Sequence, residues 1–144
     1  RGLIYYALSN PDMGSCYEIS SFLLSKCTEN KENCILEKKT RNFDGPYHTL
    51  FRRKNYDVLQ TAELCEQLFE AGADPNQAGE KNVLPIELMM ALSFTEEELH
   101  PLYDFWMKLS AVDLKLHTFD GKQPIDFAKK YKRKKLATWI KNQL

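Results

Sequence analysis

The chain has 144 residues, of which 43% are hydrophobic, and its 20 lysines and arginines balance its 20 aspartates and glutamates. This length and composition predict one folded domain and exclude a disordered segment, while a net charge of zero favours no charged partner. The charge is nevertheless segregated along the chain. Residues 37–54 carry six basic and two acidic side chains, residues 55–113 carry two basic and twelve acidic ones, and residues 114–144 carry nine basic and two acidic ones.

The first part of the chain predicts two helices. Residues 3–8 form a short apolar pattern, and a turn signal interrupts it. Residues 17–25 then place apolar side chains at helical spacing, namely Ile19, Phe22 and Leu23. The polar stretch at residues 30–43 predicts a long loop after this pair.

A second pair of helices has clearer boundaries. Proline suits the first turn of a helix because no N–H is needed there, so Pro46 predicts a helix start, with an apolar face formed by Tyr47, Leu50 and Phe51. Cations suit the negative end of a helix, which is the place that the sequence gives to Arg52, Arg53 and Lys54. Residues 57–70 predict the second helix, and Gly72 ends it because glycine adopts the left-handed conformation at little cost.

Two further pairs follow in the acidic and the last basic segments. Pro85 starts a short helix within residues 83–92. Thr95 and Glu98 have the spacing of a capping box, which predicts a longer helix that ends at residues 112–113. Residues 114–119 alternate enough to be extended. Pro124 then starts a short helix, and residues 136–144 predict a final longer one.

The same signals recur at a fixed distance. Pro46, Pro85 and Pro124 are spaced 39 residues apart, and Asp74 and Asp113 share this interval. Because two independent markers keep one spacing, the sequence predicts an internal repeat.

Two stretches resemble the ankyrin repeat family. Residues 64–88 run from a helix through Gly-Ala-Asp and a tight turn into a helix that proline starts, and residues 119–128 are similar to the family's Asp-x-x-Gly-x-Thr-Pro-Leu-His-Leu-Ala core. Residues 23–29 resemble the end of a unit, with Cys27 in place of the usual glycine. The resemblance implies an all-α, helix-turn-helix repeat solenoid with short finger loops. Its four divergent units would divide a single domain into residues 1–36, 37–76, 77–115 and 116–144.

The resemblance also implies a function, namely a non-catalytic protein-protein interaction module that binds a partner protein or peptide through the concave side of the stack. By register from the three prolines, the expected partner-binding residues are Arg41, Arg52, Arg53, Lys81, Val83, Leu92, Phe119, Lys122, Lys130 and Tyr131. This side would be basic at both ends and apolar between them, which favours an acidic peptide with an apolar anchor. The simpler interpretation is that these cations only satisfy helix carbonyls and keep the surface hydrated.

Catalysis has little support in the sequence. His48, His100 and His117 stand apart from any nucleophile; we expect His48 to hydrogen-bond a turn and His100 to lie at the surface. The run Glu96-Glu97-Glu98 is typical of a solvated first helical turn, and no glycine-rich phosphate loop is present. The sequence therefore predicts neither an enzyme nor a cofactor.

Four cysteines fall at spacings that fit no disulfide or zinc framework: Cys16, Cys27, Cys34 and Cys65. Cys27 and Cys34 with His48 would still lack a fourth ligand, so we expect no metal site. Reduced thiols are typical of intracellular proteins, which predicts a cytoplasmic or nuclear location. No apolar run is long enough for a membrane span and no signal peptide is present, so we expect no membrane insertion. Because the sequence opens within a helical pattern, we expect it to be a piece of a longer protein.

A second hypothesis concerns the basic run at residues 129–135. Such a run can neutralise phosphates, which predicts a nucleic-acid-associated or nuclear-targeting module. Against nucleic acid, the run has few aromatic side chains among its bases, and the acidic segment at residues 55–113 would repel a phosphate backbone. Nucleic-acid binding is therefore the alternative to protein binding, and the oligomeric state stays open.

Overall fold

The structure, a computed structural model, describes residues 3–29, 44–109, 112–115 and 121–143. The regular elements of these residues are helical, and none of them is a strand, which confirms the predicted all-α class. The α-helices are α1 (Leu3–Leu8), α2 (Met13–Glu29), α3 (Pro46–Phe51), α4 (Val58–Glu70), α5 (Pro85–Met90), α6 (His100–Lys108), α7 (Pro124–Lys130) and α8 (Lys134–Gln143). A 3-10 turn, η2 (Glu80–Asn82), precedes α5. Within the described ranges, no helix has the length and apolar character needed to cross a membrane.

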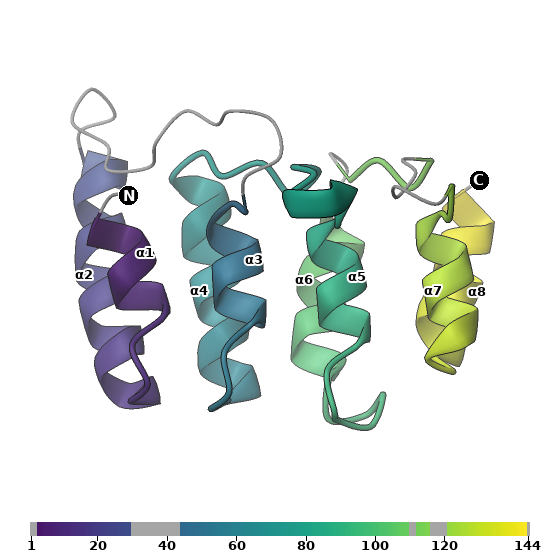
Figure 1. The fold of residues 1–144 in the computed structure, drawn as a ribbon, viewed down its shortest axis with the longest axis horizontal. Coiled ribbons are helices and arrows are strands. Elements are labelled where there is room, and N and C mark those ends of the chain that lie inside the picture. The colour runs from purple at the N-terminus through teal and green to yellow at the C-terminus, as the bar shows by residue number, and fades with distance from the viewer. Residues whose placement is uncertain (1–2, 30–43, 110–111, 116–120, 144) are drawn as a thin grey trace.

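The helices form four hairpins that stand in a row (Figure 1). Each hairpin joins a short helix to a longer one, and the short helices α1, α3, α5 and α7 line the side of the row that faces the viewer in Figure 1. Along this side, α1 contacts α3, α3 contacts α5 and α5 contacts α7, while α2 contacts α4 and α4 contacts α6 behind them. One long side of the row is therefore formed by the short helices and the turns at their ends.

Each of the three prolines of the predicted period is the first residue of a short helix. The residue two positions later accepts a hydrogen bond from the backbone N–H that precedes the proline, and this acceptor is His48 Nδ1 (3.0 Å), Glu87 Oε1 (3.4 Å) or Asp126 Oδ2 (2.9 Å). Three different side chains thus satisfy the same free donor at a helix start. The 39-residue spacing in the sequence corresponds to one helix pair in the structure.

Asp74 and Asp113, the two aspartates of the period, also form the same kind of turn. Asp74 Oδ1 accepts from the N–H of Asn76, and Asp113 Oδ1 accepts from the N–H of Lys115, each at 2.9 Å. Such a bond two residues onward is the usual turn formed by an aspartate. The two turns are joined, because the N–H of Asp113 donates to Asn76 Oδ1 at 2.6 Å.

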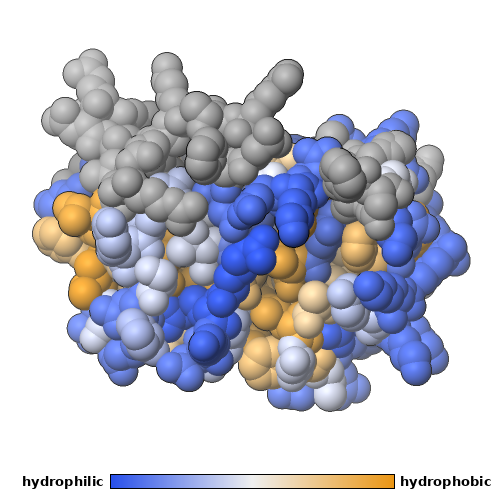
Figure 2. Space-filling view, in the orientation of Figure 1, coloured by the Kyte–Doolittle hydropathy of each residue, from blue (hydrophilic) through white to orange (hydrophobic). Residues whose placement is uncertain are grey.

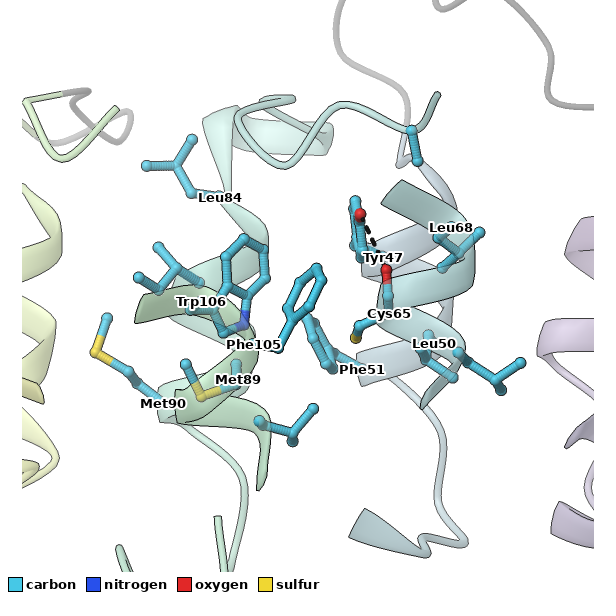
Figure 3. Packing of buried hydrophobic residues seen from close by; sticks show 14 of the residues in the cluster. Tyr47, Leu50, Phe51, Cys65, Leu68, Leu84, Met89, Met90, Phe105 and Trp106 are labelled. Atoms are coloured by element: carbon cyan, nitrogen blue, oxygen red, sulfur yellow. Dashed lines mark hydrogen bonds between the residues drawn. The ribbon is translucent and has the colours of Figure 1, made fainter. Parts of the chain in front are cut away.

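The core between the second and third pairs is aromatic (Figure 3). Trp106 of α6 lies with its ring centroid 5.7 Å from that of Tyr47 and 6.4 Å from that of Phe51, both from α3. Phe105 packs edge-on against Trp106 at 5.2 Å. Tilted and edge-on pairs of this kind add to the stabilisation that burial of the rings gives.

The first pair differs from its prediction in the length and orientation of α2. This helix spans Met13–Glu29 rather than residues 17–25, and it continues through Cys27, where the sequence comparison places the end of a unit. Cys27 is buried. Because this position holds a cysteine, and not the glycine that favours a left-handed helix end, the helix can continue through it. Ile19 and Phe22 are exposed, because the buried stripe of α2 runs through Cys16, Ser20, Leu24 and Cys27. The predicted loop at residues 30–43 lies outside the described residues.

The third pair also departs from its predicted boundaries. The capping box forms, with the N–H of Glu98 donating to Thr95 Oγ1 (3.1 Å) and the N–H of Thr95 donating to Glu98 Oε1 (3.2 Å). It closes a separate turn, however, and α6 starts only at His100. The same helix ends at Lys108 because Leu109 is extended, so the prediction of an end at residues 112–113 was wrong. The fourth pair matches its prediction, except that α8 begins two residues earlier, at Lys134.

Candidate functional site

A pocket of about 390 Å³ opens between the first and second hairpins. Its walls come from the turn after α1 and from α3 and the turn that follows it. The lining residues are Ser9, Asn10, Pro11, Asp44, Thr49, Arg52, Arg53, Lys54 and Asn55. The volume lies in the range of ligand pockets, and three of these side chains are basic while one is acidic. The pocket therefore includes two of the residues that the sequence predicted for partner binding, Arg52 and Arg53.

Arg52 lies at the open side of the pocket. Its side chain is 45% exposed, and its Nε is 2.9 Å from Asp44 Oδ2. Asp44 also accepts a hydrogen bond from the N–H of Glu80 at 3.1 Å, so the loop before α5 fixes this carboxylate. Because Asp44 neutralises one cation of the lining, the exposed Lys54 and the half-buried Arg53 leave the pocket with an excess of positive charge.

Arg53 has a different task from Arg52. Its guanidinium donates from Nη1 to the carbonyls of Leu8 (2.7 Å) and Asn10, and from Nε to the carbonyl of Asn55 (3.2 Å). The Asn55 amide in turn donates to the carbonyl of Pro11 at 2.7 Å. Charged donors satisfy the free carbonyls at a helix end particularly well. Arg53 therefore joins the second hairpin to the first and forms a wall of the pocket, rather than offering a free charge to a partner.

His48 precedes the pocket residue Thr49 in α3 and is fully buried. Its Nδ1 accepts from the N–H of Gly45, which leaves Nε2 to donate to the carbonyl of Val83 at 2.7 Å. A Cβ on Gly79 would lie 2.4 Å from Asp44 Oδ1 and 2.8 Å from His48 Nε2, so this loop requires glycine for its close approach. The predicted structural role of His48 is confirmed.

The remaining predicted contact residues are spread along the row. Lys81 and Lys122 are exposed, while Val83 and Leu92 are half-buried. The backbone carbonyls of Val83 and Leu92 are held by His48 and Arg133. In the fourth hairpin the ammonium of Lys130 lies 5.3 Å from the ring centroid of the half-buried Tyr131. Two of the predicted residues, Arg41 and Phe119, lie outside the described residues.

The basic run at residues 129–135 is interrupted in the fold. Its lysines are exposed, but Arg133 is buried and donates to the carbonyls of Met90 (3.0 Å), Leu92 (2.7 Å) and Phe94 (2.7 Å). Arg133 thus donates to carbonyls at and after the end of α5, in the same way as Arg53 donates to carbonyls at and after the end of α1. The sequence analysis did not predict this role. The available signal is the position of both arginines shortly after a short helix that starts with proline.

The described residues offer little for covalent or metal chemistry. They contain no group of three or more histidine, cysteine, aspartate or glutamate side chains placed to hold a metal ion. Burial raises the pKa of the Cys16 and Cys65 thiols, so both are protonated at neutral pH. His100 is exposed, as predicted, and lies 3.3 Å from Asp104 on the outer side of α6.

Comparisons with known proteins bear on the fold alone. No protein-family model and no curated protein matches the chain. The chain is similar to the crystal structure of a functionally unknown protein from Leptotrichia buccalis C-1013-b, with a TM-score of 0.80 and 22% sequence identity, over 99% of this chain and 75% of that chain. The likeness indicates a shared arrangement of helices.

Proposed function

We propose that the chain is a protein-binding module of the ankyrin repeat kind, which holds an acidic peptide segment of a partner along the side formed by its short helices. The observation that carries the proposal is the basic pocket between the first two hairpins. The recurrence of the proline and aspartate positions in successive hairpins supports the family assignment.

The pocket has the chemistry to bind a carboxylate. Arg52 and Lys54 supply exposed cations, and the second N–H of the Asn55 amide can donate beside them. Arg53 keeps the walls together by its bonds to the first hairpin. A peptide carboxylate would compete with Asp44 for Arg52, and the excess positive charge would attract and orient an acidic partner.

An apolar anchor has candidate contacts farther along the same side. Leu92 and Tyr131 are half-buried, so they already pack against the core and keep part of their apolar surface open. Ordered side chains of this kind lose little conformational freedom when a partner covers them. Charge would thus act at the pocket, and the apolar contact would supply most of the affinity.

The test compares two charge reversals of equal size. The double variant Arg52→Glu plus Lys54→Glu leaves Arg53 and its backbone bonds in place, and Lys129→Glu plus Lys141→Glu makes the same change in net charge on the fourth hairpin. The probe is a fluorescent decapeptide with three glutamates and one leucine, and its matched control peptide has lysine at the glutamate positions. We expect the pocket variant to weaken binding of the acidic peptide by about tenfold or more, the fourth-hairpin variant to change it by less than about threefold, and the lysine peptide not to bind.

Urea unfolding of the same variants shows whether either change acts through stability. If the pocket variant retains the affinity of the unchanged chain for the acidic peptide, the pocket is not the site. A generic DNA duplex at low salt serves as a further probe. Binding of this duplex that is lost in the fourth-hairpin variant would favour the nucleic-acid alternative, although the burial of Arg133 leaves that run without a continuous exposed row of cations.

A further inference from the structure

The first hairpin exposes apolar side chains at the end of the row. The exposed fractions are 66% for Leu3 and 69% for Tyr6 on α1, and 45% for Ile19 and 62% for Phe22 on α2. We call these four residues the edge patch. Figure 2 shows apolar side chains gathered at the end of the molecule that α1 and α2 form. Exposed apolar groups that cluster in this way mark an interaction surface more often than single ones do.

The opposite end of the row has a different surface. In α7 and α8, as far as these helices are described, no large apolar side chain is exposed, and the exposed residues include Lys129, Lys130, Lys134, Lys135 and Lys141. The outer side of the fourth hairpin is therefore polar, whereas that of the first hairpin is partly apolar.

The charges around the edge patch are self-complementary. Glu18 and Lys26 are exposed and lie four residues before and four residues after Phe22, so the three residues form one row on the surface of α2. The ammonium of Lys26 is 5.4 Å from the centroid of the Phe22 ring. If a second α2 lies antiparallel across this row with its Phe22 opposite, Glu18 of each copy faces Lys26 of the other. An interface with two-fold symmetry requires a surface that complements itself in this way.

We propose that two copies of the chain associate through the edge patch, with their α2 helices antiparallel about a two-fold axis near Phe22. Rows of residues spaced by four form ridges that pack into the grooves of a partner helix, so the row of Glu18, Phe22 and Lys26 can lie alongside its counterpart near the axis. The apolar side chains of both copies would then leave water together, which supplies the affinity. The two Glu18–Lys26 pairs fix the antiparallel orientation.

The experiment measures the oligomeric state of the whole chain by sedimentation velocity and by light scattering, between about 1 and 200 µM, a range in which weak to moderate dimers dissociate. The unchanged chain is expected to dimerise with increasing concentration, and Phe22→Glu to remain monomeric. The control is Leu59→Glu, since Leu59 is also 66% exposed but lies on α4 of the second hairpin. It is expected to dimerise as the unchanged chain does, and circular dichroism shows whether each variant is folded.

A charge swap tests the orientation. Glu18→Lys alone and Lys26→Glu alone each place like charges opposite each other twice, so each is expected to weaken dimerisation by about tenfold. The double swap Glu18→Lys plus Lys26→Glu restores opposite charges and is expected to restore dimerisation. A monomer throughout this concentration range overturns the proposal, and so does a dimer that Leu59→Glu disrupts as strongly as Phe22→Glu. A double swap that fails to restore the dimer overturns the antiparallel arrangement.

Discussion

The buried Tyr47 and Tyr103 and the half-buried Tyr56 show how residues of one type differ with their surroundings. Burial raises the pKa of Tyr47 and Tyr56 above the ordinary value, and it raises the pKa of Tyr103 to about 12. Tyr47 and Tyr56 donate to the carbonyls of Cys65 (3.4 Å) and Leu50 (3.1 Å). The hydroxyl of Tyr103 is buried and has no hydrogen-bond partner in the part of the chain that the structure describes.

These pKa shifts predict a loss of stability at alkaline pH. Because the folded chain keeps the phenol proton to higher pH than the unfolded chain, the unfolded state loses protons first. The contribution of Tyr103 is therefore complete below about pH 10 and is lost as the pH rises through 10 to 12, a change of about 2 kcal/mol. Urea unfolding between pH 7 and pH 12 measures it.

The variant Tyr103→Phe separates this contribution from the others. At pH 7 we expect it to leave the free energy of unfolding within about 0.5 kcal/mol, because the lost hydroxyl has no partner. Between pH 10 and pH 12 its stability is expected to fall less than that of the unchanged chain. Tyr56→Phe is the comparison, since it removes a hydrogen bond and is expected to cost about 1 kcal/mol at pH 7. An equal cost for both variants at pH 7 would contradict the role given to Tyr103.

At the scale of the helices, several starts are fixed by a side chain that accepts from a free N–H group. Asp12 accepts from Ser15 at the start of α2, and Asp57 accepts from Gln60 at the start of α4. The start of α8 has no such residue of its own. Instead, Glu96 of the third hairpin accepts from the N–H groups of Lys135 (2.9 Å) and Leu136 (3.4 Å).

This cap from a neighbouring hairpin predicts a specific loss. Glu96→Ala removes the acceptor and the negative charge at the positive end of α8, so we expect the free energy of unfolding to fall by about 1 kcal/mol. Glu97→Ala is the matched control, because Glu97 is exposed and adjacent, whereas the two N–H groups of α8 donate to Glu96. Chemical denaturation of both variants gives the difference. Equal stability of the two variants would mean that the cap contributes nothing.

At the scale of the whole molecule, the three junctions between hairpins use different chemistry. Arg53 joins the first and second hairpins through backbone carbonyls, and the aromatic cluster around Trp106 joins the second and third. The fourth hairpin is held by the contact of α7 with α5, by Arg133 and by Glu96. In a row of this kind each hairpin depends on its neighbours alone, so the loss of one junction should release one end.

The variant Arg133→Met tests this dependence. It leaves three backbone carbonyls without their charged donor, and we expect a loss of about 3 kcal/mol in the free energy of unfolding. Hydrogen exchange is expected to increase more in α7 and α8 than in α3 and α4, because the last hairpin can open alone. Lys134→Met, an exposed change in the same basic run, is expected to have little effect. Uniform loss of protection across all helices would show that the row unfolds as one unit.

The amino-acid sequence by itself determined the helices and their period. The effect of proline on a helix start acts over a few residues, so the sequence predicts the short helices at Pro46, Pro85 and Pro124 without knowledge of the fold. For the candidate site, the sequence placed Arg52 and Arg53 together on one surface, and the structure puts both in the lining of the pocket. The family assignment and the partner remain proposals.

Only the tertiary structure decided which side chains are exposed and which are buried or bound to the backbone. Arg53 and Arg133 bind carbonyls that lie 39 to 45 positions away in the sequence, so the residues around each arginine do not identify its partners. The exposure of Ile19 and Phe22 was decided in the same way, because it depends on which face of α2 the neighbouring helices cover. Helix formation is governed by bonds between near residues, whereas burial and pairing depend on how the hairpins pack.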